Sequence, residues 1–179
     1  MMNSLLVRFR FLAALRSGAV FALTIALLGM TPQANAAPLI TLTQGSAVTT
    51  ITSAIFHPDG ITISIESEQA GYLSHVGAFT AHFSYLAVGT PVAIAIVGNG
   101  TLTTGNGDKI FLAASIVELG ADYPRTLDGT LTITGGTGRY KGATGALVVH
   151  GIDEESLTDT ITISGTIVTA GSLLGGLLR

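Results

Sequence analysis

His75 is the side chain in this sequence best suited to chemistry. If residues 75–85 form one strand, alternate side chains share a face. That face carries His75, Phe79, Ala81, Phe83 and Tyr85. Its apolar character predicts that it points into a core, where the imidazole could act as a general base and the other four side chains could line a ligand site. The alternative, a neutral core histidine bonded to a backbone carbonyl or a buried water, is favoured because no partner for the imidazole is identifiable.

Glu118 is the second candidate for catalysis, although its place near a strand end leaves its facing unassigned. No Ser-His-Asp order, nucleophile turn or pair of inward carboxylates accompanies it, so the sequence assigns no catalytic residue. His82 would lie on the strand face opposite His75, and His150 has no second histidine at ligand spacing. We therefore expect no metal site and no cofactor.

A glycine cluster at 135–138 resembles a phosphate-binding loop only superficially. A dinucleotide fingerprint needs a helix that opens directly after the glycines, so that its N-terminus meets the anion. Here Lys141 stands where the last glycine of that pattern belongs, and another Gly-rich strand follows. The cluster instead predicts a tight turn or bulge that requires positive φ angles. The residues assigned to this structural turn are Gly135, Gly136, Gly138 and Gly142.

The first 36 residues have the three parts of a secretory signal peptide. Arginines at 8, 10 and 16 precede an apolar run over residues 19–29, and Ala34-Asn35-Ala36 fits a signal-peptidase site. A membrane anchor is the alternative, but the run has about 11 apolar residues where a spanning helix needs about 20. We expect a signal-peptide helix over 1–36, cleavage before Ala37, and a periplasmic or extracellular protein with no stable membrane span.

Composition narrows the function of the remaining chain. It carries five basic and eleven acidic residues, a formal net charge of −6, and no basic cluster. Because phosphate contacts supply most of the affinity for nucleic acids, nucleic-acid binding is not expected. The absence of cysteine excludes disulfides, thiolate catalysis and sulfur-ligated metals.

Period-two alternation runs through most of the chain after residue 47. Ile61, Ile63 and Ile65 alternate with polar residues, and the same pattern recurs around residues 131–133 and 161–167. Turn residues at 57–60, 98–100, 105–108 and 135–138 separate the runs. About eight strands without crossover helices predict an all-β domain over 37–170, an eight-stranded antiparallel up-and-down barrel of the calycin kind. A flexible Gly- and Leu-rich tail would follow at 171–179.

Three segments resemble exported bacterial proteins related to the allene oxide cyclase and dirigent barrels. They are Ser74–Thr80, Gly100–Asp108 and Ile133–Gly145, the last containing Gly-Gly-Thr-Gly-Arg-Tyr. The resemblance implies an eight-stranded barrel with a central cavity, often a homo-oligomer. It carries no catalytic or pocket residue over to this sequence beyond the glycine turn.

These observations predict an exported barrel that binds a small apolar ligand or serves as a structural module. The sequence leans against an enzyme; the enzymatic alternative is a cyclase or isomerase that acts inside the cavity. A further alternative is an outer-membrane or surface-matrix β protein, but the chain has few aromatic residues for membrane girdles. An eight-stranded barrel is either filled by its own side chains or holds one small ligand.

Overall fold

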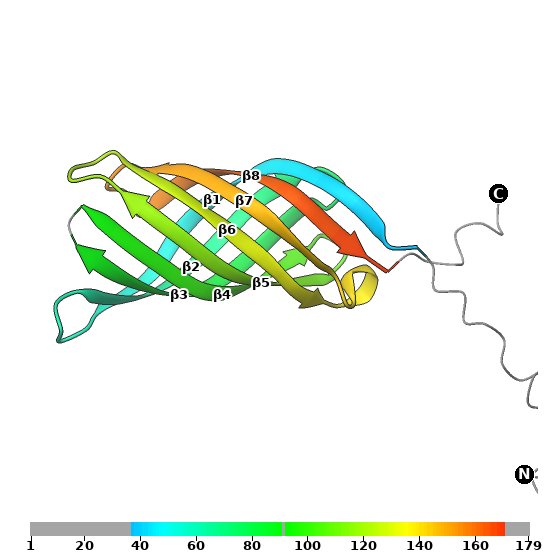
Figure 1. Ribbon diagram of the computed structural model, residues 1–179, viewed down its shortest axis with the longest axis horizontal. Coiled ribbons are helices and arrows are strands. Elements are labelled where there is room, and N and C mark those ends of the chain that lie inside the picture. Colours follow the sequence, from blue (N-terminus) through cyan, green and yellow to red (C-terminus); the bar gives the residue numbers. More distant parts are fainter. Residues whose placement is uncertain (1–36, 91, 171–179) are drawn as a thin grey trace, which may run out of the picture. The chain divides into compact units, whose positions relative to one another are not determined.

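The computed structural model describes residues 37–90 and 92–170, which form a closed barrel of eight antiparallel strands in chain order, β1 pairing with β8 (Figure 1). The predicted all-β up-and-down barrel is thus confirmed. The strands are β1 (Leu39–Phe56), β2 (Thr62–Leu73), β3 (Gly77–Thr90), β4 (Ala93–Thr104), β5 (Lys109–Leu119), β6 (Arg125–Gly136), β7 (Thr144–Asp153) and β8 (Thr158–Thr169).

The predicted signal peptide at 1–36 and the predicted tail at 171–179 lie outside the described residues. Within residues 37–90 and 92–170, no helix is long and apolar enough to cross a membrane.

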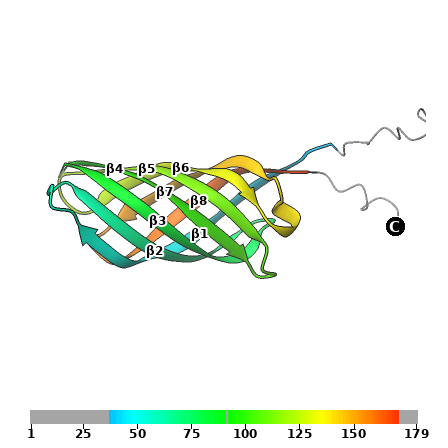
Figure 2. The same cartoon turned by 90° about the horizontal axis from the view of Figure 1, so that it is seen from below.

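The barrel has two different ends. A short 3-10 helix, η1 (Gly138–Tyr140), lies in the β6–β7 connection at the end where β1 begins and β8 finishes (Figures 1 and 2). We call this the η1 end. The connections β1–β2, β3–β4, β5–β6 and β7–β8 lie at the opposite end, at the left of Figure 1.

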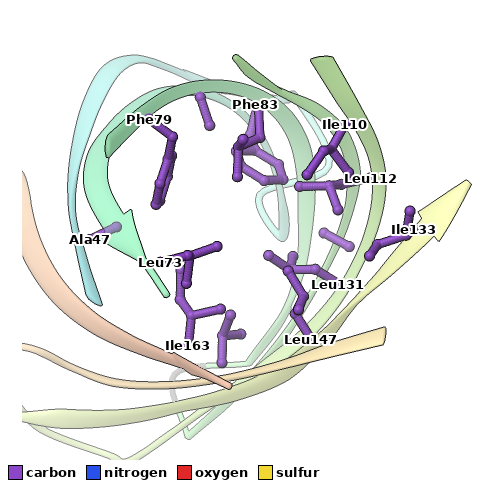
Figure 3. Packing of buried hydrophobic residues seen from close by; sticks show 14 of the residues in the cluster. Ala47, Leu73, Phe79, Phe83, Ile110, Leu112, Leu131, Ile133, Leu147 and Ile163 are labelled. Atoms are coloured by element: carbon purple, nitrogen blue, oxygen red, sulfur yellow. The ribbon is translucent and has the colours of Figure 1, made fainter. Parts of the chain in front are cut away.

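Inward-pointing side chains fill the half of the barrel near η1. Inward side chains of the first part of β3 and the last part of β2 meet those of β5, β6 and β7 across the axis (Figure 3). Phe83 is 1% exposed, and Leu73 and Ile110 are fully buried. Since interiors pack about as densely as organic crystals, this half is a solid core rather than a channel.

The turn predicted at 98–100 is wrong, because these residues lie inside β4. Gly98 and Gly100 pair with Tyr85 and Phe83 of β3, whose rings occupy the space that a Cβ would need. A Cβ at Gly100 would lie 2.2 Å from Cδ1 of Phe83. Glycine therefore makes room here for an aromatic ring instead of reversing the chain.

The glycine cluster and η1 close one end of the barrel. Gly135 has φ 151° and lies at a bulge of β6 opposite Phe111, while Gly138 and Gly142 have φ values of 53° and 70°. The reversal buries Tyr140 against the core, at 4% exposure. Arg139 Nη2 also donates a hydrogen bond of 2.9 Å to the carbonyl of Val76 across the barrel end.

Candidate ligand-binding site

The half of the barrel away from η1 contains a cavity of about 90 Å³ to which all eight strands contribute. We call that end the cavity end. The wall is mainly aliphatic, and a polar group lies on one side. The lining residues are Thr49, Ile51, Ile65, Ser67, Gln69, Tyr85, Ile96, Ile116, Glu118, Leu127, Leu131, Val149, Asp153, Asp159 and Ile161. A water molecule takes up roughly 30 Å³ in the liquid, so this cavity has room for a few waters or a small organic group.

Glu118 and Arg125 form an ion pair at the cavity. Nη1 of Arg125 donates to Oε1 of Glu118 at 2.8 Å, and the two side chains are only 13% and 10% exposed. Glu118 is the last inward residue of β5 and Arg125 is the first residue of β6, so the β5–β6 hairpin brings them together. The centroid of the Tyr123 ring lies 4.5 Å from the guanidinium carbon. The hydrogen bond to Glu118 raises the pKa of Arg125, which keeps the guanidinium charged.

Asp159 is the most perturbed carboxyl group of the cavity. Burial, followed by the negative charges of Asp153 and Glu118, raises its pKa to about 6. Its Oδ1 atom is buried and makes no hydrogen bond within the described structure. Asp153 and Asp159 are both half-buried, at the β7–β8 hairpin. The site therefore has a carboxyl group that changes its charge near neutral pH.

Tyr85 is the aromatic side chain of the cavity wall. Its ring stacks on Phe83 with centroids 5.2 Å apart and planes 5° from parallel, so the filled half of the barrel fixes its orientation. Burial raises the pKa of the phenol well above its usual value, and the neighbouring Ser67 and Gln69 side chains partly offset this. The phenol therefore stays protonated and can donate a hydrogen bond. The Ser67 hydroxyl, in a residue only 1% exposed, makes no well-formed hydrogen bond.

The structure separates the four side chains predicted to line a ligand site. All four point into the barrel, but only Tyr85 borders the cavity. Phe79, Ala81 and Phe83 are buried at 5%, 5% and 1% exposure in the filled half. Those three positions belong to the core, so a larger side chain at Ala81 would not reach into the cavity and would not block a ligand there.

His75 lies outside the barrel interior, contrary to the expectation that it faces the core. It is exposed in the β2–β3 turn with φ 64°, because β3 begins only at Gly77. It borders a surface groove at the η1 end with Val76, Arg139, Tyr140 and Lys141. His75 and Glu118 therefore occupy opposite ends of the barrel and cannot act on the same molecule.

Two residues near the start of β6 pair with different partners. Arg125 and Asp128 do not pair with each other: Arg125 bonds Glu118, and Asp128 Oδ1 lies 2.6 Å from Nδ1 of His150 on the outer surface. Among residues 37–90 and 92–170, no three histidine, aspartate or glutamate side chains are close enough to hold a metal ion.

Sequence reasoning missed several polar residues of the cavity, although strand parity contained the signal. Ser67 and Gln69 share parity with Ile63 and Ile65. Asp159 likewise precedes Ile161 by two residues and faces the same way. Ser67 and Gln69 interrupt the inward face of β2 between Ile65 and Leu73, and Asp159 lies on the inward face near the start of β8. Such residues mark the place where the interior changes from core to site.

Comparisons with known proteins identify the fold. No protein-family model matches the sequence, and no curated protein matches it. Among solved structures, the chain is similar to a pterocarpan synthase dirigent protein, with a TM-score of 0.50, 13% sequence identity, and coverage of 75% of this chain and 92% of that chain. At this level of identity the likeness concerns the fold alone: the eight-stranded barrel of this chain is similar to the barrel of that dirigent protein.

Proposed function

We propose that this protein is an exported β-barrel that binds one small, largely apolar molecule in the cavity at the end of the barrel away from η1. The observation that carries the proposal is the asymmetry of the interior. Side chains fill one half of the barrel, whereas the other half keeps a hollow of about 90 Å³ lined by aliphatic residues and a compact polar group. An apolar pocket with a few convergent polar groups is the usual form of a ligand site.

The closed η1 end supports the proposal that a ligand enters the barrel only at the cavity end. Tyr140 and Ala143 are buried there at 4% and 1% exposure, and Arg139 holds the turn onto Val76. At the cavity end, Thr49, Asp153 and Asp159 remain partly exposed, whereas Ser67 and Val149 are buried. A ligand would enter past the partly exposed residues and place its apolar body against the aliphatic wall.

Binding is tested by NMR titration of the purified protein with three small neutral molecules: phenylethanol, hexanol and cyclohexanol. We expect at least one to bind saturably with a Kd of about 1 mM or tighter, equivalent to about −4 kcal/mol. Contacts should appear between the ligand and the methyl groups of Ile116 and Val149. If none of the three binds saturably, or if the contacts lie elsewhere, the proposal is wrong.

A pair of adjacent threonines provides a matched control. Thr49 lines the cavity and Thr50 points outward from the same strand. Thr49→Phe should fill the cavity and weaken binding by about tenfold or more, whereas Thr50→Phe should leave the Kd unchanged. Equal binding by both folded variants would place the ligand elsewhere. If Thr49→Phe does not fold, the ligand–methyl contacts in the unchanged protein still decide the question.

Export is part of the proposal and rests on the signal-peptide pattern of residues 1–36. Expression of the full chain in a bacterium, followed by intact-mass measurement of the exported fraction, should give a chain that starts at Ala37. Uncleaved protein retained in the cytoplasm would contradict this part of the proposal.

A cyclase or isomerase acting in the same cavity is the second candidate function. It is favoured by one observation, the Asp159 carboxyl group whose pKa is raised to about 6, since such a group can give or take a proton near neutral pH. Conversion of a bound molecule, followed by NMR of that molecule, should then be lost in Asp159→Asn and kept in Asp128→Asn. Retained conversion in Asp159→Asn would exclude this role.

A further inference from the structure

We propose that the cavity selects a ligand that carries one protonated amine on its apolar body, held by the carboxylates of Asp153 and Asp159 and by the Ser67 and Thr49 hydroxyls. The inference rests on the proposed binding function and specifies the chemical class of its ligand.

Unpaired polar atoms at the cavity are the first observation. The described residues contain five buried side-chain nitrogen or oxygen atoms without a hydrogen-bond partner, and three of them belong to the cavity wall: Thr49 Oγ1, Ser67 Oγ and Asp159 Oδ1. The other two are Glu66 Oε2 and Nε of Arg125, and neither residue lines the cavity. All three atoms can accept a hydrogen bond. Because buried polar groups are normally paired, their clustering in one place points to a polar partner. The two hydroxyls can donate or accept, but the ionised Asp159 carboxylate can only accept, so the partner that suits all three atoms is a donor.

The charge of the cavity is the second observation. The carboxylates that line it are Glu118, Asp153 and Asp159. Arg125 is not among the lining residues, and its guanidinium is bonded to Glu118 at 2.8 Å. In the described part of the chain, no basic side chain lies within salt-bridge distance of Asp153 or Asp159. Two negative charges therefore remain beside an apolar wall, where electrostatic interactions are stronger than in water. A ligand cation would compensate them, and a ligand anion would be repelled.

The register of the strands places the proposed hydrogen-bond acceptors close together. Thr49 of β1 is paired across the strands with Asp159 of β8 and with Gln69 of β2. Ser67 follows on the same inner face of β2, opposite Ile51. An ammonium group has three hydrogen-bond donors, which matches the three unpaired atoms on the adjacent strands β8, β1 and β2, while Asp153 on β7 adds a second negative charge. The aliphatic wall, with Ile116, Leu131 and Val149, would take the apolar body.

The state of Asp159 agrees with this assignment. Its pKa is raised because its negative charge is partly desolvated and lies near other carboxylates. A bound ammonium would favour the charged form and lower that pKa. The ionisable groups that line the cavity are Tyr85 on β3, Glu118 on β5, Asp153 on β7 and Asp159 on β8. Arg125 on β6 is bonded to Glu118 and packs against the Tyr123 ring.

Three ligands of one shape test the proposal: phenylethylamine, phenylethanol and phenylacetate, titrated into the purified protein near pH 7. We expect phenylethylamine to bind about tenfold tighter than phenylethanol, and phenylacetate to bind weakest. Asp159→Asn should weaken amine binding by about tenfold, while changing the alcohol's Kd less than about threefold. Asp128→Asn, on the outer surface, is the matched control and should change neither.

The pH profile separates a charge effect from a change of shape. Amine affinity should rise between about pH 5 and pH 7, as Asp159 loses its proton, and this rise should be smaller in Asp159→Asn. If the alcohol binds in the cavity as well as the amine does, the amine assignment is wrong and the proposed binding function stands. If neither binds, both proposals fail.

Discussion

The ring of Phe83 lies directly against the backbone of Gly100 on the neighbouring strand. The two residues are cross-strand partners in β3 and β4, and a Cβ on Gly100 would lie 2.2 Å from Cδ1 and 2.3 Å from Cε1 of the ring. Phe83 in turn stacks on Tyr85, which borders the cavity. The glycine thereby sets the position of the last core ring and, through it, of the cavity's aromatic wall.

Gly100→Ala should therefore lower the free energy of unfolding by about 1–3 kcal/mol, the usual cost of overpacking a dense core. Asn99→Ala, at the adjacent exposed position, is the control and should change it by less than about 0.5 kcal/mol. Urea denaturation of both variants measures the difference. Equal stability of the two variants would show that the Phe83 ring has room to move aside.

The same glycines explain what the sequence could and could not predict. Alternation predicted the barrel, because a period of two with turn residues at regular spacing has few other solutions. The pattern at 98–100 predicts a turn because glycine and asparagine both favour turns, and the sequence alone does not show which residues lie opposite them on neighbouring strands. The need for glycine here comes from Phe83 and Tyr85, about 15 residues away in sequence and paired only after folding.

The candidate site was less predictable than the fold for a similar reason. Parity alone placed Tyr85 inside, and it would have done so for Ser67 and Asp159. Parity does not tell how far along the barrel axis an inward residue lies, and the boundary between core and cavity depends on that depth. His75 was misplaced because a turn with φ 64° interrupted the assumed strand, and such a backbone is uncommon for a residue other than glycine.

Gly138 lies against the carboxylate of Asp108, so a substitution at Gly138 should destabilise the protein more than one at Gly142. Both glycines have positive φ, but a Cβ on Gly138 would collide with Asp108 Oδ1, whereas one on Gly142 would meet nothing within 4 Å. Gly142→Ala should cost about 1–2 kcal/mol from backbone strain alone. Gly138→Ala should cost at least about 1 kcal/mol more. Equal thermal melting of the two variants would contradict the contact with Asp108.

The Glu118–Arg125 pair should show strong coupling in a double-mutant cycle. Arg125→Met leaves the Glu118 carboxylate in a largely buried site without its cation, and Glu118→Gln leaves the guanidinium without its anion. Each single variant should melt at a clearly lower temperature, and the double variant should lose less than the sum of the two. Asp128→Asn disrupts an exposed pair whose side chains are 58% and 57% exposed, so it should barely change the melting temperature. Additive losses would show that Glu118 and Arg125 act independently.

Asp159 should make the protein less stable as the pH rises from about 4 to 7, relative to a variant without this carboxyl group. Its pKa is about 6 in the folded protein, against an ordinary value of 3.8, so in between the folded state holds more protons than the unfolded state. The favourable contribution of Asp159 to the free energy of unfolding is fully present at pH values below its ordinary pKa, and it is lost as the pH rises through about 6. Asp159 is half-exposed, so with allowance for solvent screening the effect is about 1–2 kcal/mol.

Urea denaturation of the unchanged protein and of Asp159→Asn at a series of pH values measures this contribution. Asp59, whose pKa is lowered by hydrogen bonds from Thr62 and Ile61, contributes the opposite slope, but it is present in both proteins and cancels in the difference. The Asn variant should gain stability over the unchanged protein as the pH rises through 6, because it never carries the desolvated charge. A difference that stays constant with pH would mean that the Asp159 carboxyl titrates normally, and the negative charge inferred for the cavity would then be well solvated.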